Sequence, residues 1–316
     1  PCGPPKANVL ADPKRLSGYG SEDAPRPDCN STARGDPLLS SQPTHPYICT
    51  ACGTQYDDSF SPRPDCPVCE DPRQFVPPSG QSWTTLEELR ETHSNEIREL
   101  EEDKLWGIGT VPRFAIGQRA LLLRTPAGNL LWDCISLIDD ETIASVSDLG
   151  GVDAIAVSHP HFHAAMVEWS REFGGAPIYL HEADEEWVRR RHDAFVFWSG
   201  DTHELAPGLT FVRTGGHFPG FQCLVWNDAA DGRGALLSGD QPHVCPDRRH
   251  LAFMYSYPNY VPLGPAAVRH TRDVLARFRF DRIYGAWWDR VVPDGAEAVL
   301  ARSVDRHLRA IGTAQA

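Results

Sequence analysis

Residues 152–163 read VDAIAVSHPHFH, a short apolar run that ends in three histidines at alternate positions. The run over Val152–Val157 is typical of a buried strand. Side chains alternate along a strand, so an extended His159-Pro-His161 projects both imidazoles from one side of the chain, toward one metal ion. Burying three imidazoles as ordinary core residues would demand three sets of hydrogen bonds. We therefore interpret His159, His161 and His163 as parts of a functional site.

Two later segments fit the same site. Residues 215–220 read GGHFPG, a glycine-rich turn that presents His217, and residues 236–240 read LLSGD, an apolar strand that ends in Asp240. An aspartate just beyond a buried strand is either a helix N-cap or a ligand. Three histidines with a carboxylate suit zinc, and they also suit iron or manganese.

In this order, the segments resemble the metallo-β-lactamase fold superfamily, which includes β-lactamases, lactonases, hydroxyacylglutathione hydrolases and persulfide dioxygenases. The resemblance runs from Pro112 to the C-terminus and implies a four-layer αββα sandwich of the α/β (α+β) class. Four motifs carry it: the opening hairpin over residues 119–133 with Asp133, the start of the HxHxDH motif at His159 and His161, the third histidine at His217, and the bridging aspartate at Asp240.

The chain departs from the family at two ligand positions. His163 and Ala164 replace the Asp-His pair of the motif, and Trp287 stands where the family has its last metal-binding histidine. The resemblance therefore implies a single metal rather than a pair. The expected ligands are His159, His161 and His217, with Asp240 as the fourth ligand or a close neighbour. A second site built from His163, Asp240 and His243 is the alternative.

These residues predict a metallo-hydrolase. A zinc-bound hydroxide forms near neutral pH and would attack an ester, thioester, lactone or amide of a small molecule. Asp240 would orient this nucleophile, and His163, at the place of the family's water-positioning aspartate, would shuttle a proton. Aromatic walls around a metal suit a small apolar or aromatic substrate. The candidate substrate-binding residues are His243, Tyr255, Tyr257 and Trp287.

Two other functions stay open. With iron, the same ligands leave positions free for dioxygen or a thiol, which would make the protein a mononuclear non-heme iron oxygenase or redox enzyme similar to the persulfide dioxygenases. A non-catalytic metal-binding scaffold would also carry a site that has lost ligands.

Residues 46–80 contain two Cys-x-x-Cys pairs, Cys49 with Cys52 and Cys66 with Cys69. Two such pairs place four thiolates around one tetrahedral metal. They resemble the rubredoxin family, with Glu70 where rubredoxins usually have glycine, and imply a small rubredoxin-like zinc-ribbon domain. Zinc in a structural role and iron in electron transfer both fit this head.

The remaining segments complete the predicted domain organisation. Residues 1–45 lack apolar periodicity and predict an irregular N-terminal tail, in which Cys2 and Cys29 have no assigned role. Residues 81–111 predict a helical linker, with one helix over 84–103 that begins at a capping box of Thr84 and Glu87. Residues 112–316 form the predicted metallo-β-lactamase-like domain.

Charge and composition exclude some classes of protein. The 316 residues carry a net charge of −13, and nine of these net negative charges lie within residues 46–103. An acidic balance argues against a nucleic-acid partner. No apolar run approaches the ~18 residues of a membrane helix, and no signal-peptide pattern is present. We therefore expect a cytoplasmic protein with a small-molecule substrate and no membrane partner, and leave open a homo-oligomer or a redox partner.

Overall fold

The computed structural model describes Leu10 and residues 43–102 and 104–312. Most of the predicted tail over residues 1–45, including Cys2 and Cys29, lies outside these described residues. Leu10 itself is buried in the core, where its carbonyl accepts a hydrogen bond from the Tyr179 hydroxyl at 3.1 Å.

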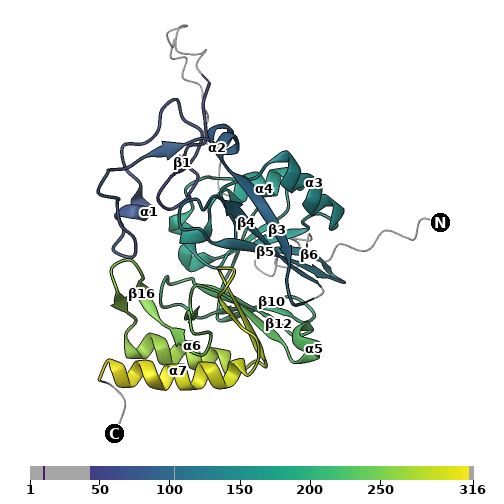
Figure 1. Ribbon diagram of the computed structural model, residues 1–316, viewed down its shortest axis with the longest axis vertical. Helices are drawn as coiled ribbons and strands as arrows, with labels where there is room; N and C mark the ends of the chain where they lie inside the picture. Colours follow the sequence, from purple (N-terminus) through teal and green to yellow (C-terminus); the bar gives the residue numbers. More distant parts are fainter. Residues whose placement is uncertain (1–9, 11–42, 103, 313–316) are drawn as a thin grey trace, which may run out of the picture.

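Two β-sheets form the centre of the body (Figure 1). The first sheet has seven strands in chain order, antiparallel up to β6 and parallel from β6 to β9. Its strands are β3 (Ser94–Glu99), β4 (Leu105–Val111), β5 (Arg119–Thr125), β6 (Gly128–Trp132), β7 (Ala154–Ala156), β8 (Ile178–His181) and β9 (Phe195–Trp198).

The second sheet has six strands in the order β10-β11-β12-β13-β18-β19. Neighbours are antiparallel except β13 and β18, which run parallel. Its strands are β10 (Thr202–Ala206), β11 (Leu209–Arg213), β12 (Gln222–Trp226), β13 (Ala235–Gly239), β18 (Arg282–Gly285) and β19 (Val291–Val292).

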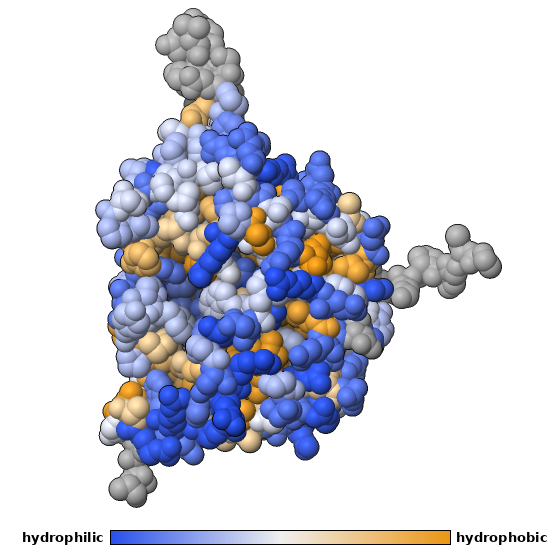
Figure 2. All heavy atoms as spheres, viewed as in Figure 1, coloured by the Kyte–Doolittle hydropathy of each residue, from blue (hydrophilic) through white to orange (hydrophobic). Residues whose placement is uncertain are grey.

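Helices cover the outer face of each sheet. Helices α3 (Asp140–Asp148) and α4 (Met166–Glu172) pack on the first sheet, and α6 (Pro265–Leu275) and α7 (Ala296–Ala310) pack on the second. Hydrophilic side chains dominate the lower part of Figure 2, over α6 and α7. The outer layers therefore face solvent on one side and a sheet on the other.

Alternation along the strands explains the layers. In β5, Leu121 and Leu123 contribute to the core between the sheets, whereas Ala120 and Leu122 contribute to the core under α3 and α4. Successive side chains point to opposite faces of a sheet, so a strand that is apolar on both faces must be covered on both. This arrangement confirms the predicted αββα sandwich.

Shorter elements complete the chain. The head contains one helical turn and a strand that pairs with a second strand just after residue 80, and the body adds two small two-stranded ribbons. These elements are β1 (Ile48–Cys49), α1 (Pro67–Glu70), β2 (Trp83–Thr84), α2 (Leu86–Thr92), η2 (Pro160–Phe162), η3 (Glu182–Trp187), α5 (Ala229–Gly232), β14 (His243–Val244), β15 (Leu251–Ala252), β16 (Met254–Ser256) and β17 (Val261–Pro262). Within the described residues, no helix has the length and apolarity to span a bilayer.

The predicted helix over residues 84–103 is wrong. Helix α2 ends at Thr92, and the residues after it form β3 and β4, two strands of the first sheet. The weak apolar stripe that suggested a helix includes Ile97, which instead pairs with Ile108 across β3 and β4. Strand pairing within the sheet outweighs local helix propensity here.

The capping box lies one residue later than predicted. The Thr85 hydroxyl accepts a hydrogen bond from the Glu88 N–H at 3.2 Å, and the Glu88 carboxylate accepts one from the Thr85 N–H at 3.1 Å. These two bonds satisfy backbone donors that the first turn of α2 leaves free. The predicted hairpin over residues 119–133 is confirmed as β5 and β6.

The capping box can be tested by substitution. Thr85→Ala removes the hydroxyl and should lower the free energy of unfolding by about 1 kcal/mol. Thr85→Ser keeps the hydroxyl and should stay close to the wild type. Urea unfolding of both variants measures the difference, and equal losses in the two would contradict a capping role.

Candidate metal sites

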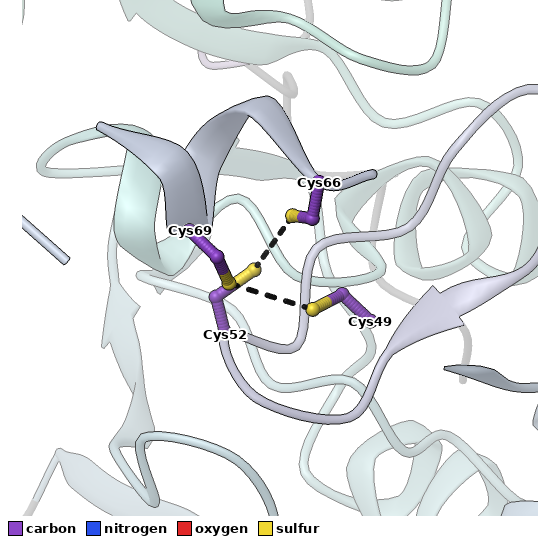
Figure 3. Close-up of side chains that lie close together, drawn as sticks. All are labelled: Cys49, Cys52, Cys66 and Cys69. Atoms are coloured by element: carbon purple, nitrogen blue, oxygen red, sulfur yellow. Dashed lines mark hydrogen bonds between the residues drawn. The ribbon is translucent and has the colours of Figure 1, made fainter. Parts of the chain in front are cut away.

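The head brings its four cysteines into one buried cluster (Figure 3). The Sγ atoms of Cys49 and Cys69 lie 3.6 Å apart, and those of Cys52 and Cys66 lie 3.7 Å apart. A disulfide needs about 2.05 Å. Four sulfurs around one metal at about 2.3 Å lie about 3.8 Å apart. The spacing therefore fits a tetrahedral metal site. It is too long for a disulfide between Cys49 and Cys69 or between Cys52 and Cys66.

Neighbouring side chains donate hydrogen bonds to this cluster. The Gln81 side-chain amide donates to the Cys49 sulfur at 3.1 Å, and the Tyr56 hydroxyl lies 3.1 Å from the Cys66 sulfur. Hydrogen bonds from the other three thiols, Cys52 first, lower the pKa of the Cys49 thiol below its ordinary value. Polar contacts to sulfur tune a bound metal, so Gln81 and Tyr56 are the residues that would do so here.

The body brings together His159, His161, His217 and Asp240, whose ligand atoms all lie within 4.8 Å of one another. Nδ1 of His161 lies 3.1 Å from Nε2 of His217, and Nε2 of His159 lies 3.6 Å from Oδ1 of Asp240. Ligand atoms about 2.0–2.1 Å from one tetrahedral metal lie about 3.3 Å apart. The four residues expected to hold the metal therefore meet around a point of suitable size.

Hydrogen bonds on the far side of two rings fix their orientation. The carbonyl of Tyr255 accepts from Nδ1 of His217 at 2.8 Å, which leaves Nε2 free to bind a metal. The Ser158 hydroxyl lies 2.9 Å from Nδ1 of His159 and contacts that ring on the side away from Asp240. Such partners set the tautomer of a metal-binding histidine.

The loop that carries His159 and His161 is not the strand end that the sequence suggested. Strand β7 ends at Ala156, and Pro160–Phe162 is a 3-10 turn. The Ser158 N–H that precedes the turn donates to Asp133 at 2.7 Å. The two rings therefore converge because a turn aims them, and Asp133 at the end of β6 holds that turn.

The last strand residue before Asp240 must be a glycine. Gly239 has a φ of +56°, and a Cβ there would lie 2.6 Å from the Ser158 hydroxyl oxygen. Only glycine combines this backbone conformation with so close an approach. Gly239 therefore lets the second sheet bring Asp240 up to the histidine turn of the first.

Burial favours the neutral forms of the histidines. It lowers the pKa of His217 to about 4, and it lowers the pKa of His159 and His161 well below the ordinary value, where neighbouring histidines add to the effect. A neutral imidazole is the form that binds metal.

Two atoms that face the centre of this group are buried without a hydrogen-bond partner, His159 Nε2 and Asp240 Oδ1. Burial, with the Asp133 carboxyl adding, raises the pKa of Asp240 well above its ordinary value. A buried carboxylate without a partner is costly, and a cation bound between these atoms would satisfy both. The donor set therefore fits a divalent metal.

A cavity of about 440 Å³ opens beside this group. Its wall includes three of the four proposed ligands, residues of the loop before β5, and residues of the head. The lining residues are Ala51, Arg73, Gln74, Phe75, Arg113, Ala115, Ile116, His161, His217, Asp240, Tyr257, Pro258 and Trp287.

The structure separates the predicted site residues into two groups. Tyr257 and Trp287 line the cavity. His243 lies behind them, with ring centroids 5.0 Å from Tyr257 and 5.2 Å from Trp287, and Tyr255 contributes its carbonyl to His217. His163 is buried, and burial lowers its pKa to about 3. Across the described residues, neither His163 nor His243 joins a group of metal-binding side chains.

Sequence reasoning missed the contribution of the head to this cavity. Arg73, Gln74 and Phe75 follow the second cysteine pair closely, but nothing in their pattern points to the body. The contact depends on how the head docks, and a local pattern carries no information on docking.

Removing one ligand should empty one site only. His159→Ala is expected to lose the metal of the body and to retain the metal of the head, because no cysteine ligand changes. His270→Ala, a half-buried histidine of α6, serves as the control and should keep both. Elemental analysis of the purified proteins measures this, and unchanged metal content in His159→Ala would show that the ligand assignment is wrong.

Asp184 holds the turn that carries His217, and its titration is testable. Its carboxylate accepts the Gly220 N–H at 2.7 Å, and burial raises its pKa to about 7. Because this value exceeds the unfolded value of about 3.9, its contribution to stability is complete below that pH and is lost as the pH rises toward 7.

Asp184→Asn keeps an acceptor oxygen and does not ionise. Relative to the wild type, this variant should therefore gain stability as the pH rises from about 4 to 7, by at most about 1.4 kcal/mol per pH unit. Urea unfolding across this range measures the trend, and a difference that stays constant with pH would refute it.

Comparison with known proteins identifies one relative of similar sequence. No known family model matches it. It is 43% identical over 268 residues to the uncharacterized protein YmaE of Bacillus subtilis (strain 168). The alignment covers 84% of this chain and 97% of that protein.

Solved structures of low sequence identity share the fold. VMB-1 superposes with a TM-score of 0.52 at 13% identity, over 69% of this chain and 99% of that chain. The DIM-1 metallo-β-lactamase superposes with a TM-score of 0.52 at 12% identity, over 69% of this chain and 98% of that chain. The chain thus belongs to the family of YmaE, and its body has the metallo-β-lactamase fold.

Proposed function

We propose that this protein is a metal-dependent hydrolase that cleaves an ester, thioester, lactone or amide of a small molecule. One observation carries the proposal. A buried group of three histidines and one aspartate, with His159 Nε2 and Asp240 Oδ1 unpartnered, opens onto a cavity of about 440 Å³. A cavity of this size suits a small molecule rather than a macromolecule.

The metal and the chain would divide the chemistry. His159, His161, His217 and Asp240 would hold a zinc ion, which would act as a Lewis acid and lower the pKa of a bound water to about 7. The chain holds those ligands rigid: the Tyr257 hydroxyl donates to the Asp240 carbonyl, and the Phe221 ring stacks on His159 with centroids 4.7 Å apart. We propose that the other carboxylate oxygen of Asp240 orients this water.

The cavity wall supports a substrate with an apolar or aromatic part. Phe75, Ile116 and Trp287 supply apolar surface, while Gln74 and Arg113 supply hydrogen-bond donors. We propose that the apolar part packs on Trp287 and Tyr257 and that the scissile group faces Asp240. The proton-shuttle role of His163 stays a prediction, because this ring lies outside the described cavity wall.

An iron-dependent redox enzyme is the second candidate, and the position of one residue of the head favours it. Ala51, which lies between Cys49 and Cys52, lines the same cavity as His161 and Asp240. Iron at both sites would make the head an electron carrier whose cluster borders the substrate cavity. Zinc and iron accept the same ligand types, so the identity of the metal decides between the two candidates.

Metal analysis together with an activity screen tests the proposal. Protein purified without added metal should contain zinc and hydrolyse at least one member of a panel of esters, thioesters, lactones and amides. Asp240→Asn should lower kcat/KM by about 100-fold or more, because it removes both an anionic ligand and the carboxylate that orients the water. Asp193→Asn, an exposed aspartate, should not.

Other outcomes would contradict hydrolysis. Iron in the body with a rubredoxin-like visible spectrum would favour the redox enzyme. A body that binds no metal would leave only the scaffold.

A further inference from the structure

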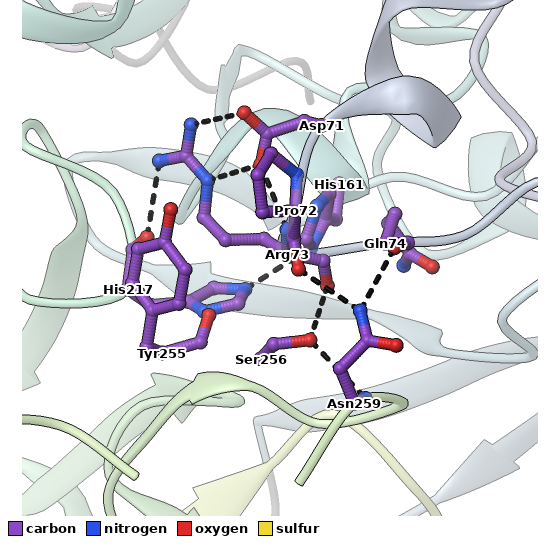
Figure 4. A network of polar contacts seen from close by, with 9 residues as sticks. All are labelled: Asp71, Pro72, Arg73, Gln74, His161, His217, Tyr255, Ser256 and Asn259. Atoms are coloured by element: carbon purple, nitrogen blue, oxygen red, sulfur yellow. Dashed lines mark hydrogen bonds and ion pairs between the residues drawn. The ribbon is translucent and has the colours of Figure 1, made fainter. Parts of the chain in front are cut away.

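The head is joined to the candidate site by a short piece of chain. Cys69 lies in α1, and the segment Asp71–Phe75 follows directly, so that only a few residues separate the cysteine cluster from the wall of the cavity. Within this segment, the Asp71 carboxylate accepts hydrogen bonds from Arg73 N, Nε and Nη2 at 2.9, 2.6 and 2.8 Å (Figure 4). The segment therefore orients its own guanidinium.

The guanidinium of Arg73 reaches the backbone of a proposed ligand. Its Nη1 donates to the His217 carbonyl at 3.2 Å. Its Cζ lies 3.8 Å from the centroid of the Phe218 ring and 4.9 Å from that of Trp187. The Phe218 ring in turn lies 4.8 Å from the His161 ring. One buried cation of the head thus contacts the peptide that carries His217 and the ring that packs on His161.

Side chains of the body donate hydrogen bonds to the backbone of the same segment. The Asn259 side-chain amide donates to the carbonyls of Pro72 at 2.9 Å and Gln74 at 3.1 Å, and the Ser256 hydroxyl donates to the Arg73 carbonyl at 3.2 Å (Figure 4). The stretch that supplies these donors also supplies the Tyr255 carbonyl that orients His217. Head and ligand are therefore fastened to one piece of the body.

We propose that Arg73 is a positioning residue for His217 and that the cysteine cluster, by fixing Arg73, controls how tightly the body binds its metal. The head is then part of the candidate site rather than an appended module. A hydrogen bond from a cation to a ligand's own peptide, together with packing on the neighbouring ring, holds His217 where the other ligands need it. Hydrogen-bond partners behind metal ligands typically affect metal affinity by about 10–100-fold.

The proposal concerns metal affinity and does not need the protein to be a hydrolase. Competition titration of zinc against a chromophoric chelator, in the full chain, measures the affinity of the body as the part of the binding that His159→Ala abolishes. Arg73→Gln should weaken this affinity by about 10–100-fold. Arg63→Gln, a change of the only other arginine in residues 46–80, should leave it unchanged.

Conservative rescue separates positioning from mere support. Arg73→Lys keeps a cation but loses the planar fork that holds Asp71 and His217 together, so it should recover part of the affinity that Arg73→Gln loses. Equal affinity in the wild type and Arg73→Gln would overturn the proposal, and so would identical losses in the Gln and Lys variants.

If Arg73→Gln does not fold, Asn259→Ala decides instead. Asn259 is exposed and fastens the segment without touching a ligand. A weaker body site in Asn259→Ala would support the proposal, and wild-type affinity would overturn it. For the link to the head, Cys69→Ser should also weaken the body site, and an unchanged body site in that variant would show that the cysteine cluster does not control Arg73. A failure of hydrolysis would bear only on the proposed function.

Discussion

Four buried side chains that face one another impose the main constraint on this molecule. His159 and His161 come from the turn after β7 in the first sheet, while His217 and Asp240 come from the second sheet, between β11 and β12 and after β13. Without a cation, the Asp240 carboxyl would have to be protonated, or its buried negative charge would cost free energy. The cluster therefore ties the two sheets together at one edge, and the Asp133 contact to the turn and the glycine at position 239 both serve this meeting.

The small size of the head makes its own metal site equally demanding. A segment of about 40 residues or fewer rarely folds without a metal, a disulfide or a partner surface. Here the sulfur spacing excludes the Cys49–Cys69 and Cys52–Cys66 disulfides, and the body provides the partner surface. The head also forms part of the cavity wall, where Gln74 and Phe75 line it together with Tyr257 and Trp287 of the body. Its place in the cavity wall is a consequence of how the head docks on the body.

Neither the ligand set nor the cavity alone decides between the two kinds of chemistry. Nitrogen, oxygen and sulfur ligands at these spacings bind zinc and iron alike. The geometry is therefore compatible with both hydrolysis and redox chemistry. A wall that is part head and part body suits both. Trp287 adds an aromatic surface to this wall, and the proposed substrate would pack against it.

Local motifs identified both cysteine pairs and the candidate ligands, because turn residues and ligand spacing are properties of neighbouring residues in the chain, and the family resemblance that these motifs carry implied the fold class and the ligand set. They failed over residues 84–103, where Ile97 pairs with Ile108 in a sheet that no local window contains. They also gave no sign of Arg73, whose partners Asp71 and His217 lie two and 144 residues away. The sequence by itself determined which side chains are available to bind metal. Only the tertiary structure decided which of them meet and what surrounds them, because those contacts join residues far apart in the chain, as Arg73 and His217 show.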